Sequence, residues 1–203
     1  MCRLTAAPAP GTLLQVNEGR RLDTRYSAPG YLFGEHPAPL LVELATVARL
    51  LPPAGRALDL AMGEGQNACY LASLGLEVEG VDISALAIRK ARALARRRGV
   101  RLHARCADLR RIELPAARYD LLTCFHFLRR ELFGSMREAV ALRGLLVLEI
   151  ATVRNLERHP NPSRPYVLEE GEAQAIFSDW QVLLSREGWR DDHHVAQMVA
   201  RRP

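Results

Sequence analysis

Between residues 56 and 151, short apolar runs alternate with stretches of helical periodicity, and this alternation constrains the fold more than any other feature of the chain. Short apolar runs bounded by turn-forming residues are typical of buried strands, and helices between them are typical of a parallel sheet with crossover connections. The pattern predicts strands at residues 57–61, 77–83, 101–108, 119–127 and 145–151. It predicts helices at residues 66–74, 84–98 and 130–140.

The segments on either side of this region are less regular. Residues 21–37 are rich in aromatic and turn-forming residues and are predicted to form an ordered loop, followed by a helix at residues 40–51. Residues 152–170 contain three prolines and show no periodicity, which is typical of a loop that covers a site. After a short helix at residues 171–177, the extended segments 181–186 and 194–201 are expected to pair as an antiparallel hairpin at the sheet edge.

A chain of 203 residues, 48% of them hydrophobic, can bury a core without a metal or a disulfide framework. We therefore expect one α/β domain over residues 1–203. Its architecture should be Rossmann-like and doubly wound, with a mostly parallel seven-stranded sheet and an antiparallel C-terminal strand.

Composition argues against several classes of protein. The apolar runs are too short to cross a bilayer and the first ten residues lack a signal sequence, so we expect a cytoplasmic protein with no membrane partner. The four cysteines are scattered, so neither a metal site nor a disulfide scaffold is expected. The net charge of +5 comes from arginines mixed with acidic residues, which does not favour a nucleic-acid partner.

A glycine turn follows the first predicted strand. Gly63 and Gly65 allow a tight turn and a close approach of the backbone to a ligand, and the N-terminus of the next helix offers free N–H groups. Asp82 ends the second strand, where a carboxylate can accept hydrogen bonds from both hydroxyls of a ribose. Asp108 ends the third strand, where a carboxylate can accept a hydrogen bond from the exocyclic amine of adenine. Parallel strands bring their carboxyl ends to one edge, so these groups should meet there.

This arrangement resembles the class I S-adenosylmethionine-dependent methyltransferases over nearly the whole chain. Residues 58–68 resemble the first motif of that family, residues 80–84 the second, residues 107–109 the third and residues 119–122 the fourth. The chain is most similar to the small tellurite-resistance and thiopurine-methyltransferase-like enzymes, through residues 25–34 and 162–172. Met62 and Gln66 depart from that subgroup, which often has cysteine and arginine there.

The resemblance implies S-adenosyl-L-methionine as the cofactor. It implies that the glycine turn faces the methionine moiety, Asp82 the ribose, and Asp108 with Leu109 the adenine. The N-terminal residues would close over the methionine end as a lid, and Phe125 would flank the transferring methyl group. The full set of implied cofactor-binding residues is Arg25, Tyr31, Phe33, Asp59, Ala61, Gly63, Gly65, Asn67, Asp82, Ile83, Asp108, Leu109 and Phe125.

By the same resemblance, residues 1–39 form the N-terminal segment and lid, residues 40–151 the cofactor-binding core, and residues 152–203 the acceptor loop and the C-terminal hairpin. His126 and Arg130 follow the fourth strand and are the candidates for contacting the acceptor, His126 as proton acceptor and Arg130 as an anion clamp. The expected acceptor is a small molecule, such as a thiol, a metalloid oxyanion or a heterocycle, and the expected oligomeric state is a monomer or a homodimer.

Two alternatives stay open at this point. The glycine pattern also fits a nicotinamide-dependent oxidoreductase, although a single sheet leaves no room for a separate substrate domain. A module that binds a nucleotide without catalysis is the other alternative. Methylation of nucleic-acid bases is disfavoured, because residues 124–127 lack the proline-rich aromatic tetrad of enzymes that methylate exocyclic amines.

Overall fold

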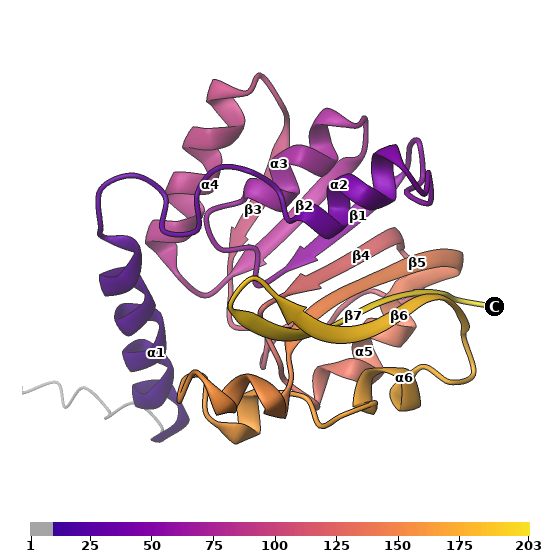
Figure 1. The fold of residues 1–203 in the computed structure, drawn as a ribbon. Helices are drawn as coiled ribbons and strands as arrows, with labels where there is room; N and C mark the ends of the chain where they lie inside the picture. The colour runs from indigo at the N-terminus through magenta and orange to yellow at the C-terminus, as the bar shows by residue number, and fades with distance from the viewer. Residues whose placement is uncertain (1–9) are drawn as a thin grey trace, which may run out of the picture.

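The computed structural model describes the backbone of residues 10–203 and the side chains of residues 18–203. Cys2 and the first nine residues of the expected N-terminal segment lie outside the described residues. A seven-stranded sheet runs through the molecule in the order β3-β2-β1-β4-β5-β7-β6 (Figure 1). The strands are β1 (Arg56–Leu60), β2 (Glu77–Asp82), β3 (Leu102–Cys106), β4 (Tyr119–Phe125), β5 (Val140–Ala151), β6 (Gln181–Arg190) and β7 (His193–Arg201).

The first five strands are parallel and the last two are antiparallel to their neighbours. β1 pairs in parallel with both β2 and β4, while β7 pairs antiparallel with β5 and with β6. The predicted mostly parallel sheet with an antiparallel C-terminal strand is therefore confirmed. Its strand order reverses between β1 and β4, and such a switch point is where open α/β sheets bind ligands.

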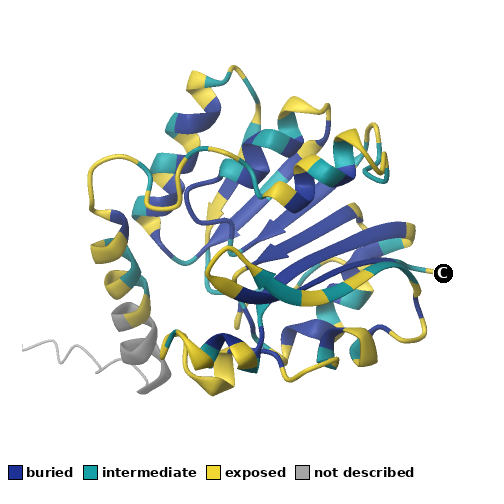
Figure 2. Ribbon diagram, in the orientation of Figure 1, coloured by how far each residue is buried: buried dark blue, intermediate teal, exposed yellow. Residues whose placement is uncertain are grey.

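Helices cover both faces of the sheet (Figure 1). One face carries α2 (Pro39–Thr46), α3 (Gln66–Ser73) and α4 (Ala85–Arg97), and the other carries α5 (Leu132–Ala139) and α6 (Glu172–Ile176). Strands β1, β2, β4, β5 and β7 are mostly buried between these two layers, whereas the edge strands β3 and β6 are largely half-buried or exposed (Figure 2). Ser84 caps α4 as its position before the helix predicts, since its side chain accepts a hydrogen bond from the N–H of Ala87 at 3.0 Å.

The N-terminal segment differs from the expected loop. Its first part is a helix, α1 (Pro10–Tyr26), which lies beyond the carboxyl ends of the strands (Figure 1). The sequence of α1 is polar and lacks an apolar stripe, so periodicity does not reveal it. Contacts with α4 hold it instead, because Asp23 accepts hydrogen bonds from the Ser84 hydroxyl and from the N–H of Leu86.

Two other segments are more regular than expected. Residues 152–170 contain two 3-10 turns, η1 (Val153–Glu157) and η2 (Arg164–Tyr166). The hairpin strands extend to a two-residue turn at Asp191 and Asp192. The sequence does not predict this full length, because the polar edge strand β6 lacks an alternation of apolar residues. In the part of the chain that the structure describes, no helix is long and apolar enough to cross a membrane.

Candidate cofactor-binding site

The glycine turn joins β1 to α3 at the carboxyl edge of the sheet. Gly63 and Gly65 have φ angles of 55° and 84°, in the left-handed region that favours glycine. Gly65 is the N-cap of α3, and the N–H of Gly63 donates a hydrogen bond to Oδ2 of Asp82 at 2.9 Å. The predicted turn and the predicted acidic residue of the second strand therefore lie in direct contact.

Asp82 is buried and anchored by the backbone. Its Oδ1 accepts a hydrogen bond from the N–H of Ser84 at 2.8 Å, so that each carboxylate oxygen has one backbone donor. Burial raises the pKa of this carboxyl above its ordinary value, while the donors from Ser84 and Gly63 act in the opposite direction. Each oxygen keeps a second lone pair for a ligand hydroxyl.

A cavity of about 300 Å³ opens next to Asp82, and its wall comes from the ends of four strands and from two covering segments. Ala61 follows β1, Ile83 follows β2, and Asp108 and Leu109 follow β3. Residues 126–129 follow β4, α1 contributes Glu18, Arg21 and Leu22, and the loop after β5 contributes Pro162 and Tyr166; Arg110 completes the lining. The register of the parallel strands brings these residues together, as the sequence predicts.

Asp108 faces the cavity, but an arginine already occupies its carboxylate. Nε of Arg110 lies 2.8 Å from Oδ1 of Asp108, and Nη2 of Arg110 lies 2.7 Å from Oδ2. The same Nη2 lies 3.2 Å from Oε2 of Glu18 on α1. The hydrogen bonds from Arg110 hold the pKa of Asp108 below its ordinary value. Glu18, Arg110 and Asp108 therefore join α1 to the expected adenine end of the cavity. We call these three residues the lid latch.

Asp59 lies within β1, behind the glycine turn rather than in the cavity wall. It is 1% exposed, and its Oδ1 accepts a hydrogen bond from the hydroxyl of Thr123 at 2.7 Å. Its Oδ2 is buried and has no hydrogen-bond partner among the described residues. Burial raises the pKa of Asp59 to about 7, with the Thr123 hydroxyl opposing the rise and the nearby Asp82 adding to it.

Three residues expected at the methionine end lie outside the cavity wall. Tyr31 packs beside α4, where its hydroxyl donates to the carbonyl of Lys90 and accepts from Arg97, both at 3.0 Å. Arg25 and Phe33 are exposed. These contacts are expected for a loop over residues 21–37. The chain is instead helical up to Tyr26, and the helix directs this segment along α4.

Tyr26 takes the position over the glycine turn, although no motif identified it. Its side chain is buried, and a Cβ atom added to Gly63 would lie 3.0 Å from the Tyr26 hydroxyl oxygen. Burial and the neighbouring carboxylates of Asp82 and Glu64 raise the pKa of this phenol. Tyr26 belongs to the segment 25–34 that carries the resemblance, but the sequence does not show which aromatic residue of this segment would reach the turn.

Glu64 and Asn67 fasten the N-terminal segment to the core. The fully buried carboxylate of Glu64 accepts hydrogen bonds from the N–H of Leu32 at 2.7 Å and from Nζ of Lys90 at 2.8 Å. Oδ1 of Asn67 accepts from the N–H of Ala38 at 2.8 Å. Asn67, expected in the cofactor site, therefore has a structural partner outside it.

Of the two residues expected to contact the acceptor, only His126 lines the cavity. Arg130 points away and donates to both carboxylate oxygens of Glu172, at 2.6 and 2.7 Å, and to the carbonyls of Pro165 and Val167, both at 2.9 Å. Arg130 therefore lies outside the cavity wall in this structure, because its donors hold the loop after β5. Arg129 lines the cavity in its place.

Phe125, at the end of β4, is buried and lies beside His126, with ring centroids 6.3 Å apart. It belongs to the core cluster under α2 and α3 rather than to the cavity wall. Phe127, Pro162 and Tyr166 provide the apolar part of the wall near His126, and Tyr166 is 53% exposed. The sequence analysis did not identify these residues as site residues.

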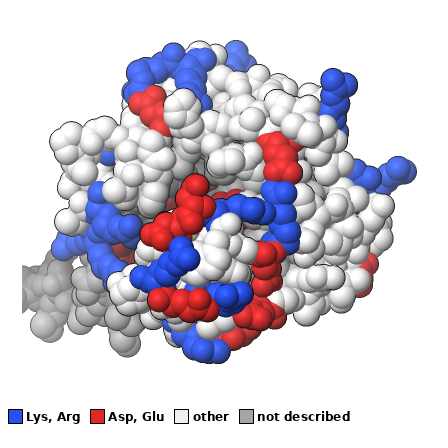
Figure 3. Space-filling model, in the orientation of Figure 1, with Lys and Arg blue, Asp and Glu red and all other residues white. Residues whose placement is uncertain are grey.

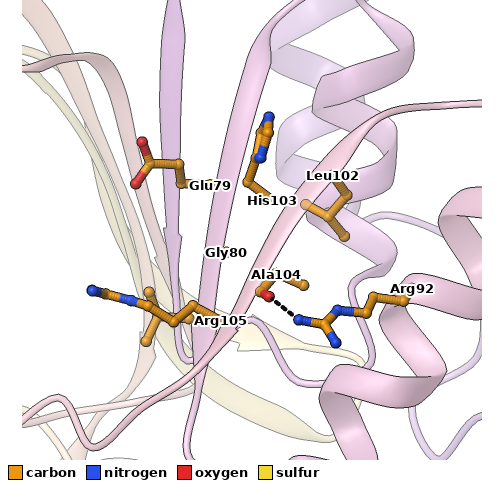
Figure 4. A pocket seen from close by; sticks show the side chains of 8 residues that line it. Glu79, Gly80, Arg92, Leu102, His103, Ala104 and Arg105 are labelled. Atoms are coloured by element: carbon orange, nitrogen blue, oxygen red, sulfur yellow. Dashed lines mark hydrogen bonds between the residues drawn. The ribbon is translucent and has the colours of Figure 1, made fainter.

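A second, more open cavity of about 390 Å³ lies at the other edge of the sheet, along β2 and β3 (Figure 4). Arg92 extends from α4 and donates to the carbonyl of Ala104 at 2.7 Å. Glu79, His103 and Arg105 also line it. It lies along the strands rather than at their carboxyl ends.

On the face shown in Figure 3, basic and acidic side chains are interspersed, so this face carries no continuous basic surface.

Comparisons with known proteins agree with this geometry. A family model described as a methyltransferase domain matches residues 57–144. Protein-L-isoaspartate O-methyltransferase 2 of Marinobacter nauticus is 31% identical over 155 residues, covering 74% of this chain and 69% of that protein. Ribosomal RNA small subunit methyltransferase B of Thermus thermophilus is 38% identical over 108 residues, covering 53% of this chain and 25% of that protein.

Solved structures share the fold. The crystal structure of TehB from Haemophilus influenzae has a TM-score of 0.67 and 20% identity, covering 80% of this chain and 62% of that chain. At this identity the likeness supports the architecture alone. The matching family model and the relative from Marinobacter nauticus carry the assignment further: the chain belongs to the class I S-adenosylmethionine-dependent methyltransferases, and its cofactor is S-adenosyl-L-methionine.

Proposed function

We propose that this enzyme transfers the methyl group of S-adenosyl-L-methionine to a small-molecule acceptor by in-line displacement. The observation that carries the proposal is the wall of the cavity around His126. There the chain's own loop, through Pro162 and Tyr166, lies across from residues 126–129. This loop covers the end of the cavity at which the acceptor would lie, and the covering favours a small acceptor over a macromolecule.

The cavity residues fit the cofactor. Asp82 has a free lone pair on each oxygen for the ribose hydroxyls, and Ile83 and Leu109 offer apolar side chains for the adenine ring. When bound, S-adenosyl-L-methionine supplies a methyl group already activated on a sulfonium sulfur.

The protein's task is then alignment rather than activation. Asp82 would fix the ribose, the backbone of the glycine turn would face the methionine moiety, and Tyr26 would cover the turn. His126 would face the acceptor. Arg110 of the lid latch occupies the carboxylate of Asp108, so adenine binding would require Arg110 to release at least one carboxylate oxygen. Family membership replaces the alternative of a nicotinamide-dependent oxidoreductase. The chemical class of the acceptor is part of this proposal, because the relatives are named as protein and ribosomal RNA methyltransferases.

The test has two arms. Isothermal titration with S-adenosylhomocysteine measures the cofactor site, and we expect one molecule bound per chain. Methyl transfer from labelled S-adenosyl-L-methionine is then compared across 2-mercaptoethanol, 6-mercaptopurine, tellurite, an isoaspartyl peptide and a ribosomal RNA fragment. We expect turnover of at least one of the three small molecules and of neither macromolecule. Methylation of the peptide or the RNA alone would contradict the proposal.

A further inference from the structure

A series of polar contacts runs from His126 across strands β5, β7 and β6, on the face of the sheet that α2 covers. Nε2 of His126 lies 3.5 Å from Oε1 of Glu149 on β5. Oε2 of Glu149 accepts a hydrogen bond from Nε2 of Gln197 on β7 at 2.6 Å, and Oε1 of Gln197 accepts from Nε of Arg186 on β6, also at 2.6 Å. Arg186 in turn donates to both carboxylate oxygens of Glu43 on α2.

Burial makes this series specific. Glu149 and Gln197 are 8% and 5% exposed, so neither can exchange its partner freely with water. A buried carboxylate is costly unless its lone pairs are satisfied. Gln197 satisfies Oε2, and this leaves Oε1 directed at His126. The side chain of His126 is 60% exposed and forms the end of the series that reaches the cavity.

The backbone of His126 is also constrained. Its φ angle is 54°, in the left-handed region, which is unfavourable for a residue other than glycine. The N–H of His126 donates to the carbonyl of Glu149 at 2.8 Å. Backbone and side chain of His126 are thus both held by the same residue, and strained conformations that persist are concentrated at functional sites.

The charged groups that face His126 come from two strands. Partial burial lowers the pKa of the imidazole most, Glu149 on β5 raises it, and His193 on β7 lowers it. The net pKa lies below its ordinary value. A neutral imidazole that donates its Nε2 hydrogen toward Glu149 keeps a free lone pair on Nδ1.

We propose that Glu149 is a positioning residue that holds His126 as the base for the transfer, and that the acceptor carries its proton on the attacking atom, as a thiol or a hydroxyl does. This inference rests on the proposed function. His126 takes the proton of the acceptor as the acceptor's lone pair forms the bond to the methyl carbon. The electron pair of the breaking carbon–sulfur bond passes to sulfur, which leaves a neutral thioether, a methylated acceptor and an imidazolium paired with Glu149.

The first test measures positioning without an acceptor. The imidazole resonances of the full-length protein saturated with S-adenosylhomocysteine are titrated by NMR, and His126 is assigned with His126→Gln. Glu149→Gln should lower the pKa of His126 by about one unit, because it removes a negative charge within contact distance. His193→Gln should raise it, because it removes a like charge. Glu79→Gln removes a carboxylate far along β2 and should leave it unchanged.

An unchanged His126 titration in Glu149→Gln would overturn the positioning role, whatever the acceptor is.

The second test measures the pH dependence of kcat/KM with 2-mercaptoethanol and with tellurite. The thiol reaction should fall on the acid side with the pKa of His126, and this limb should move to lower pH in Glu149→Gln. His126→Gln should reduce the thiol rate about 100-fold or more. Methylation of tellurite but not of the thiol, or a limb that does not move, would overturn the inference. Failure to bind S-adenosylhomocysteine would count against the proposed function instead.

Discussion

Gly65→Ala is the substitution whose cost the geometry defines most closely. Gly65 has a φ angle of 84°, and a Cβ atom added there would lie 2.7 Å from Cβ of Ala91 on α4 and 3.2 Å from its Cα. A side chain in the left-handed region costs about 1–2 kcal/mol. Crowding of the added methyl group against Ala91, whose methyl group cannot rotate away, adds about 1–3 kcal/mol. We therefore expect Gly65→Ala to lower the free energy of unfolding by about 2–5 kcal/mol.

Gly99→Ala is the matched control. Gly99 also has a positive φ angle, 65°, but a Cβ atom added there would meet nothing within 4 Å. Its substitution should cost only the conformational part, about 1–2 kcal/mol. Urea unfolding followed by circular dichroism measures both variants, together with Ala91→Gly and the double variant Gly65→Ala/Ala91→Gly.

The double-mutant cycle isolates the contact between the two methyl groups. Ala91→Gly alone should destabilise the helix by about 1 kcal/mol, yet in the Gly65→Ala background it should recover part of the loss. Equal costs for Gly65→Ala and Gly99→Ala, or no coupling between positions 65 and 91, would refute the argument that close packing of α3 and α4 requires glycine at this turn.

Other predictions follow from single contacts. Asp82→Asn should weaken S-adenosylhomocysteine binding about 10- to 100-fold by calorimetry, since one carboxylate lone pair is replaced by a donor. Arg110→Gln should strengthen that binding by up to about fivefold because the lid latch opens, and weaker binding would contradict the latch. Arg130→Gln should lower the free energy of unfolding by about 1–3 kcal/mol and leave cofactor affinity unchanged. The raised pKa of Asp59 means that stability falls as pH rises from about 4 to about 7, and Asp59→Asn should reduce this fall in urea unfolding.

The sheet and the strand-end residues could be predicted because their signals are local and repetitive. Each predicted strand overlaps an observed one, and parallel pairing then brings Asp82 and Asp108 to one edge whatever the details of the loops. The Ser84 cap could be predicted for the same reason, since capping depends on residues within one turn. Periodicity thus predicts positions on the regular elements of the chain.

The covering segments could not be predicted, because their conformations depend on contacts with distant parts of the chain. α1 is polar, and its position depends on Asp23 meeting the N-terminus of α4. The partners of Glu149 also lie far away along the chain, on strands whose register is set by the hairpin. Its sequence neighbours are apolar strand residues that do not indicate a polar series behind the site.

The exchange of roles between Arg129 and Arg130 shows how narrow that limit is. Both precede α5 in a short turn, where the N–H of Leu132 bonds to the carbonyl of Arg129 and the N–H of Phe133 to that of Arg130. Consecutive residues in such a turn point in different directions, so one faces the cavity and the other faces Glu172. Residue type and approximate position favour both arginines equally. Only the carboxylate of α6 selects Arg130 for the loop, and this selection leaves Arg129 in the cavity wall.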